Sequence, residues 1–211
     1  MTPATLSAAI GLVVFAYLFG SIPFGLVLTR LFTSIDIRRE GSGNIGATNV
    51  RRLAGTPLGI LTLAGDVSKG ALPVYLAQMV TPAPIISQEV YVSVVALAAF
   101  FGHLYPLYMK LKNGGKGFAT ATGGLAVISP AAVLIALAAF LLAAGWSNRV
   151  SAGSLTAAAA LPPAVWWTTR VPLFAVCALI MTLWIYARHR DNIKRLLNGT
   201  EPGIRSKSGN R

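Results

Sequence analysis

Long apolar stretches separated by short polar loops constrain this chain more than any other feature. A transmembrane helix needs about 20 predominantly apolar residues, and five clear stretches are near that length: 6–28, 57–80, 90–109, 151–168 and 171–187. Charged residues make up only 11% of the chain, against about 25% in a typical soluble domain. The sequence therefore predicts an all-α integral membrane protein, with a single polytopic domain over residues 1–198.

A further apolar run, at 118–146, is long for one helix. Ser129 and Pro130 interrupt it, and a residue before proline disfavours the α conformation. We therefore expect two helices, near 118–128 and 131–146, and about seven transmembrane helices in all, some short or broken. Three more prolines lie inside or at the ends of spans, where they are expected to kink or end helices: Pro23, Pro73 and Pro106.

The basic residues indicate how such a chain would lie in a membrane. The chain has 18 Lys and Arg against 6 Asp and Glu. Seven spans with the N-terminus outside would place all the basic residues except Lys69 and Arg170 in the cytoplasm, as the positive-inside rule expects; five spans would give the same parity. We predict a cytoplasmic C-terminus and a polar, mobile tail over residues 199–211. Nucleic-acid binding is disfavoured, because the basic residues occupy short loops between apolar spans.

The first concentration of polar residues is the glycine-rich segment 41–52. It contains Gly-x-Gly-x-x-Gly, but a dinucleotide fingerprint needs a surrounding βαβ unit, and here apolar spans flank the segment. Glycines nevertheless let backbone N–H groups approach an anion, and a following helix N-terminus adds partial positive charge. The segment is a candidate phosphate site; the alternative is a solvated loop with good capping residues. Its neutral donors are Ser42, Asn44, Thr48 and Asn49.

Two further clusters carry similar chemistry. Residues 110–117 place lysines beside paired glycines, which suits an oxyanion; contact with lipid head groups is the alternative. Residues 188–195 follow the last span, and a basic run in that position is most often a topology anchor. Within it, however, His189 and Asn192 are spaced i, i+3 and would share a helix face.

Few other polar groups lie within the spans. Asp66 and Lys69 are spaced i, i+3 in the second span, so they are functional candidates, while a structural ion pair is at least as compatible with the spacing. Cys177 is the only cysteine, which excludes an intrachain disulfide and a multi-cysteine metal site. His103 and His189 are far apart and form no metal-binding pattern. The sequence predicts no metal and no cofactor.

In their order along the chain, these segments resemble the bacterial acyl-phosphate:glycerol-3-phosphate acyltransferases, the PlsY family. The resemblance covers nearly the whole chain and is carried by 20–25, 41–52, 66–70, 102–106, 114–117 and 189–196. It implies transfer of a fatty acyl group from acyl phosphate to the 1-hydroxyl of sn-glycerol 3-phosphate, the first acylation of phospholipid biosynthesis. The products are lysophosphatidic acid and phosphate. It also implies a seven-helix protein of the bacterial inner membrane, with its active site at the cytoplasmic face and no metal.

The resemblance implies roles for individual residues. Glycerol 3-phosphate would be held by Ser42, Arg52, Lys112, His189 and Asn192. Acyl phosphate would be held by Asn44, Thr48, Asn49, Gly114, Gly115, Lys116 and Gly117. The catalytic set would be His189, Asn192 and Lys116. One departure from the family's Lys-Gly-Gly-Lys-Gly, the extra Asn113, leaves open whether Lys110 or Lys112 takes the family lysine's place.

The implied substrate suggests how the reaction would proceed. An acyl phosphate is an activated mixed anhydride, so orientation and charge stabilisation could carry catalysis. We expect a substrate phosphate oxygen to accept the hydroxyl proton, with His189 or His103 as the competing base. Expected partners are acyl phosphate, glycerol 3-phosphate, membrane lipid and the soluble enzyme that makes acyl phosphate. A transporter or channel for a phosphorylated solute is the alternative function, but polar clusters at one face favour interfacial chemistry.

Overall fold

The computed structural model describes residues 3–80 and 86–204, and all the regular structure in them is helical. This confirms the predicted all-α class. The helices are α1 (Pro3–Gly20), α2 (Phe24–Phe32), α3 (Ala47–Ala54), α4 (Thr56–Met79), α5 (Gln88–Leu104), a 3₁₀ turn (Leu107–Met109), α6 (Phe118–Ile128), α7 (Pro130–Ser147), α8 (Val150–Thr169), α9 (Pro172–Arg188) and α10 (Arg190–Leu197).

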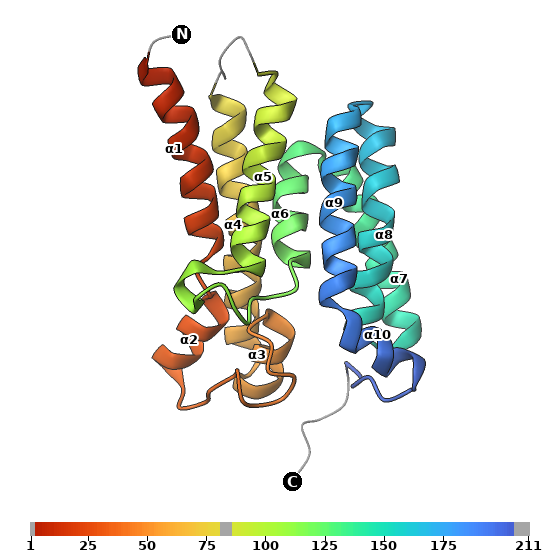
Figure 1. Cartoon of the computed structure of the whole chain (residues 1–211). Coiled ribbons are helices and arrows are strands. Elements are labelled where there is room, and N and C mark those ends of the chain that lie inside the picture. The colour runs from red at the N-terminus through yellow and green to blue at the C-terminus, as the bar shows by residue number, and fades with distance from the viewer. Residues whose placement is uncertain (1–2, 81–85, 205–211) are drawn as a thin grey trace.

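The long helices pack side by side, and three short helices lie together at one end of the molecule (Figure 1). Helices α1, α5, α7 and α9 run toward this end, which we call the α10 end, and α4, α6 and α8 run back. The α10 end carries α2, α3 and α10, together with the loop between α5 and α6. The polar segments of the sequence therefore collect at one end of an apolar bundle.

The lengths of the helices only partly match the predicted spans. By length and hydropathy, 88–109 and 130–147 are each sufficient to cross a membrane, and the bent pairs α1–α2 and α9–α10 raise the number to four. Seven is not reached by this measure, because α4, α6 and α8 do not meet it; α6 has only 11 residues.

Proline divides two of the predicted apolar stretches, as expected. The chain breaks at Ser129–Pro130, and the Ser129 hydroxyl caps α7 by accepting from Ala132 N–H at 3.2 Å. The span predicted over 6–28 is broken near Pro23, since α1 ends at Gly20 and α2 begins at Phe24 with a bend of 47°. Pro23 causes the break, because it lacks an N–H and restricts the residue before it.

Helices α4 and α6 approach each other so closely that only glycine fits at two contacts. A Cβ on Gly70 would collide with the carbonyl oxygen of Thr120, and one on Gly123 with that of Val67. The Thr120 hydroxyl donates to the carbonyl of Asp66 at 2.9 Å. Small residues and hydroxyl hydrogen bonds of this kind stabilise helix pairs in membranes, and this contact fixes α6 against α4.

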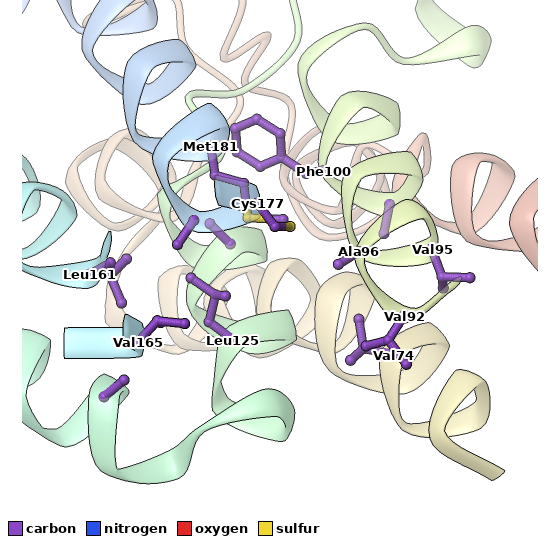
Figure 2. Close-up of a cluster of buried hydrophobic side chains, with 14 of the residues drawn as sticks. Val74, Val92, Val95, Ala96, Phe100, Leu125, Leu161, Val165, Cys177 and Met181 are labelled. Carbon is purple, nitrogen blue, oxygen red and sulfur yellow. The ribbon is translucent and has the colours of Figure 1, made fainter. Parts of the chain in front are cut away.

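One apolar core joins all the long helices around α5 and α9. It includes Val74 of α4, Phe100 of α5, Leu125 of α6, Leu161 of α8 and Met181 of α9, all of them buried (Figure 2). Because side chains from five helices meet in this cluster, the α10 end is built on a packed bundle and not on independent loops.

Candidate active site

A cavity of about 380 Å³ opens at the α10 end, and residues from all three polar segments line it. The loop before α3 contributes Ser42 and Asn44, and the loop before α6 contributes Gly114 and Lys116. Asn192 enters from α10. The structure thus brings together five of the residues predicted for the site, although Ser42 and Asn192 are 150 positions apart in the chain.

The loop before α3 is held in shape by the amide of Asn49. Its Oδ1 accepts from the Ser42 N–H at 3.0 Å, and its Nδ2 donates to the carbonyl of Asn44 at 3.0 Å and to that of Ile37 at 3.2 Å. The side chain is 3% exposed and does not line the cavity. Asn49, predicted to hold acyl phosphate, therefore shapes the loop that carries Ser42 and Asn44.

The glycine loop before α6 is fixed from two sides. Arg188 donates from Nη2 to the Gly114 carbonyl at 2.6 Å and from Nε to the Gly115 carbonyl at 3.1 Å. On the other side, the Gly115 N–H donates to the His103 carbonyl at 3.1 Å. A planar guanidinium suits two adjacent acceptors, so Arg188 defines the path of these two peptides.

A chain of hydrogen bonds begins at the lining of the cavity and continues behind it. Lys116 Nζ donates to Asn192 Oδ1 at 2.5 Å, and Asn192 Nδ2 donates to the Glu201 carboxylate at 2.6 Å. Glu201 also accepts from the Ser151 hydroxyl at 2.6 Å and from Arg195 Nε at 2.7 Å. These partners determine which way the amide points, because only Oδ1 can accept from the ammonium.

Glu201 lies in the stretch that the sequence assigned to the tail. It is 7% exposed. Burial alone would raise its pKa, but hydrogen bonds from Ser151, Asn192 and Arg195 outweigh burial, and the pKa lies below its ordinary value. The N–H of Ile204 also donates to the carbonyl of Asn148 at 2.9 Å. Residues 199–204 therefore pack on the bundle; the rest of the predicted tail, 205–211, lies outside the described residues.

The cavity is strongly basic. Its lining includes one acid, Asp191, and the cations Lys116, Arg188, Arg190 and Arg195. The pKa of Lys116 is lowered to about 8, chiefly because burial disfavours the ammonium. Glu201 raises that pKa, and the neighbouring charges of Arg195 and Arg52 lower it. An anion entering the cavity would relieve this crowding of positive charge.

His189 lies at the junction of α9 and α10, outside both helices, and the two helices meet there at 61°. Its Nδ1 donates to the Ile185 carbonyl at 2.8 Å, which leaves Nε2 as an acceptor. Its pKa is lowered to about 4, first by burial and then by the charge of Lys116. The imidazole is therefore neutral near pH 7.

Several predicted site residues lie outside the cavity lining. Lys112 and Thr48 are exposed, and Arg52 is half-buried on α3. His189, predicted as catalytic, is buried beside the cavity and is not part of its lining. Gly115 and Gly117 lie buried behind the cavity-facing residues of their loop. Of the loop's lysines only Lys116 lines the cavity; Lys110 and Lys112 are both exposed.

Sequence reasoning did not single out Arg188 or Glu201. Arg188 was attributed to a basic membrane anchor, and the only available signal for Glu201 was a single acid in a basic segment. The proposed ion pair within α4 is present, with Lys69 Nζ 2.7 Å from Asp66 Oδ1. Within residues 3–80 and 86–204, no group of three His, Cys, Asp or Glu side chains is arranged to hold a metal ion.

The family model for glycerol-3-phosphate acyltransferases matches residues 10–199 of the chain. The chain belongs to the glycerol-3-phosphate acyltransferase family. The acyltransferase of Syntrophotalea carbinolica is 52% identical over 186 residues, which are 88% of this chain and 92% of that protein. The acyltransferase of Anaeromyxobacter dehalogenans strain 2CP-1 is 45% identical over 209 residues, covering 97% of this chain and all of that protein.

Solved structures give the same assignment. Crystal structures of PlsY, an integral membrane glycerol 3-phosphate acyltransferase, are 37% identical to this chain in a glycerol 3-phosphate form and in a lysophosphatidic acid form. The TM-scores are 0.86 and 0.83, over 93% of this chain and 96% and 95% of those chains. The resemblance to the PlsY family is confirmed. The protein is an acyltransferase, and the alternative of a transporter or channel is not supported.

Proposed function

We propose that this acyltransferase moves a fatty acyl group from acyl phosphate to the 1-hydroxyl of glycerol 3-phosphate and releases lysophosphatidic acid and phosphate. The observation that carries the proposal is the single basic cavity to which three distant segments contribute. Both substrates are phosphate dianions near pH 7, so a site that holds them together must offset several negative charges. The PlsY forms with glycerol 3-phosphate and lysophosphatidic acid support the acceptor and the product.

The residues in and around the cavity divide between the two substrates in this proposal. We assign glycerol 3-phosphate to Ser42, Arg52, His189 and Asn192, and acyl phosphate to Asn44, Lys116 and the peptides of 114–117. Lys112 is left out of the glycerol 3-phosphate set, since it is exposed and Lys116 is the lysine of this loop that lines the cavity. Thr48 stays a proposed ligand on the exposed side of α3. The acyl chain would leave this polar site toward lipid.

The reaction then needs little covalent help from the protein. The 1-hydroxyl oxygen attacks the acyl carbon, the new C–O ester bond forms, and the bond between the acyl carbon and the phosphate oxygen breaks. Phosphate leaves with the bonding electron pair and takes up the hydroxyl proton, which balances the step. Lys116 and the loop peptides would stabilise the charge that grows on the leaving phosphate, and the Asn192 amide would hold Lys116 in line.

The acceptor of the hydroxyl proton is a substrate phosphate oxygen in this proposal. His189 has a free Nε2, but a pKa of about 4 makes it a weak base, whereas the second pKa of a phosphate monoester is about 6. His103 and His189 are both buried and neither lines the cavity, but His189 lies between the lining residues Arg188 and Arg190. In this proposal its Nε2 accepts a hydrogen bond that orients the acceptor hydroxyl.

The same proposal includes an orientation in the bacterial inner membrane. Helices α1 and α4 to α9 would make seven crossings, with α6 as a short one, and the α10 end would face the cytoplasm. The basic residues of 30–52, 110–116 and 188–195 lie at that end, as the positive-inside rule requires. The soluble enzyme that makes acyl phosphate would then have direct access to the cavity.

The decisive experiment supplies the purified protein, in detergent, with palmitoyl phosphate and glycerol 3-phosphate. Release of phosphate and formation of a lysophospholipid should require both substrates, and palmitoyl-CoA should not replace palmitoyl phosphate. Turnover with palmitoyl-CoA and none with palmitoyl phosphate would overturn the donor assignment.

A matched pair of variants tests the site itself. Lys116→Gln removes a cation that lines the cavity, and Lys194→Gln removes one from the exposed face of α10. We expect Lys116→Gln to reduce kcat/KM at least about 100-fold and Lys194→Gln to change it less than about threefold. Equal losses would mean that only the general charge of this end matters.

A further inference from the structure

We propose that Asp66, Lys69 and His103, a buried ionic triad behind the cavity, fix the Gly114–Gly115 segment and thereby position the loop and its Lys116 for phosphate binding. The triad consists of two residues of α4 and one of α5, and none of the three lines the cavity. They would be positioning residues that act through the loop. The proposal rests on the proposed function only in naming acyl phosphate as the loop's ligand.

The three side chains form a closed set with almost no access to solvent. Lys69, Asp66 and His103 are 1%, 3% and 4% exposed. Lys69 Nζ lies 2.7 Å from Asp66 Oδ1 and 3.2 Å from His103 Nδ1, and 5.2 Å from the centre of the Phe24 ring. Burying two charges carries a large desolvation cost that an ordinary helix contact does not require. A role beyond packing would account for the triad.

The triad determines how the imidazole is presented. The charged lysine can only donate, so His103 Nδ1 accepts from it and the ring proton lies on Nε2. That edge of the ring packs against Gly115, where a Cβ would overlap His103 Nε2. The backbone of the same histidine accepts from the Gly115 N–H. His103 thus contacts the loop with both its ring and its carbonyl.

The loop before α6 lies between the His103 imidazole and Arg188. The guanidinium is bound to the carbonyls of Gly114 and Gly115, and the ring fills the space beside Gly115, so the two peptides are held from both sides. Lys116 follows immediately and reaches Asn192. A displacement of the loop would therefore move both the loop peptides and the lysine relative to the substrate.

The test uses two substitutions at position 103 that separate its contacts. His103→Asn retains an acceptor near the Nδ1 position for Lys69 but removes the ring edge beneath Gly115. His103→Gln can reach Gly115 but has no acceptor at the Nδ1 position. Thr182→Val is the control, because it removes a buried hydrogen bond between α9 and α8, far from the loop in sequence.

We expect His103→Asn to raise the KM for palmitoyl phosphate about tenfold or more, with kcat within about threefold of the unaltered enzyme, since small displacements of binding groups are costly. Amide hydrogen exchange over 110–118 should be faster in His103→Asn than in Thr182→Val at equal thermal stability. His103→Gln should show a smaller increase in KM and also provides the comparison if His103→Asn does not fold.

Two outcomes would overturn the proposal. A kcat lowered about 100-fold or more in both variants, with KM and exchange unchanged, would make His103 the general base. The triad would be purely structural if both His103 variants lowered the thermal stability but left KM and exchange unchanged. That is the result expected of Thr182→Val. The exchange measurement needs no substrate, so it remains decisive if the unaltered enzyme fails to use palmitoyl phosphate, a result that would defeat only the proposed donor.

Discussion

The ammonium of Lys116 lies 2.5 Å from Oδ1 of Asn192, so the loop before α6 and the last helix meet through one hydrogen bond. The contact joins residues 76 positions apart and lies on the lining of the cavity. Because Glu201 holds the other end of the amide, the position of the lysine depends on three segments at once.

The first prediction concerns pH. In the free protein the pKa of Lys116 is about 8, so the ammonium that binds phosphate is present below pH 8 and is lost above it. We expect kcat/KM to fall about tenfold per pH unit above that point. In Lys116→Arg the cation persists, because arginine stays protonated in this range, and the decline should disappear. A pH–rate profile that falls identically in Lys116→Arg would assign the titration to another group.

The second prediction concerns Glu201. Glu201→Gln replaces the carboxylate that accepts from Ser151, Asn192 and Arg195. Because the new NH₂ group cannot accept, either Arg195 or both Ser151 and Asn192 lose their acceptor, and we expect a loss of about 1–3 kcal/mol in the free energy of unfolding. The Asn192 amide can then turn, which should lower kcat/KM.

Denaturation by SDS and steady-state kinetics measure the two effects of Glu201→Gln. Since the pKa of Glu201 is below its ordinary value, its stabilising contribution is complete above about pH 4.5 and is lost as the pH falls further. Glu201→Gln should remove that part of the pH dependence. Full activity in a folded Glu201→Gln variant would contradict a role in orienting Asn192.

The third prediction concerns the contact between α4 and α6. Gly70→Ala places a methyl group against the Thr120 carbonyl, whereas Gly145→Ala meets no atom within 4 Å. We expect Gly70→Ala to destabilise the protein by at least about 1–3 kcal/mol through overpacking. Gly145→Ala should be neutral or stabilising by up to about 1 kcal/mol, because alanine is the better helix former. Thermal unfolding of both variants in the same detergent makes the comparison, and equal shifts would refute the close contact.

The fourth prediction concerns the charge pair in α4. Lys69→Met leaves Asp66 buried without its counter-ion, which should cost about 3–5 kcal/mol of stability. The double variant Asp66→Asn/Lys69→Met leaves no uncompensated charge and should be more stable than Lys69→Met alone. A double-mutant cycle measures the coupling, and strictly additive effects would show that the two charges do not stabilise each other.

Much of this fold follows from local rules of sequence. The apolar stretches predicted most of the long helices, and Ser129–Pro130 correctly divided one of them, since a residue before proline disfavours helix. The same rule applies at Pro23, where a kink or helix end was expected and the first span is broken. Composition reports which residues prefer lipid, but the direction of a helix after a break depends on packing against other elements, which no local pattern contains.

In the site, too, some residues could be predicted from local sequence and others depend on packing. Ser42, Asn44, Gly114, Lys116 and Asn192 were predicted and line one cavity, because glycine, amide and cation together indicate anion chemistry. The pattern left open whether Lys110 or Lys112 contacts substrate, and the structure exposes both of them. The pattern also did not identify Glu201, because its role depends on three hydrogen-bond donors from distant parts of the chain that meet at its carboxylate.

The return of the chain to Asn148 after α10 limits where the protein can be modified for purification. Ile204 is hydrogen-bonded to Asn148, so an affinity tag or protease site inserted directly after Leu197 would pull the Glu201 carboxylate away from its donors. Such a preparation would remain embedded in detergent yet show weakened turnover. Tags that begin beyond residue 204 leave this attachment intact.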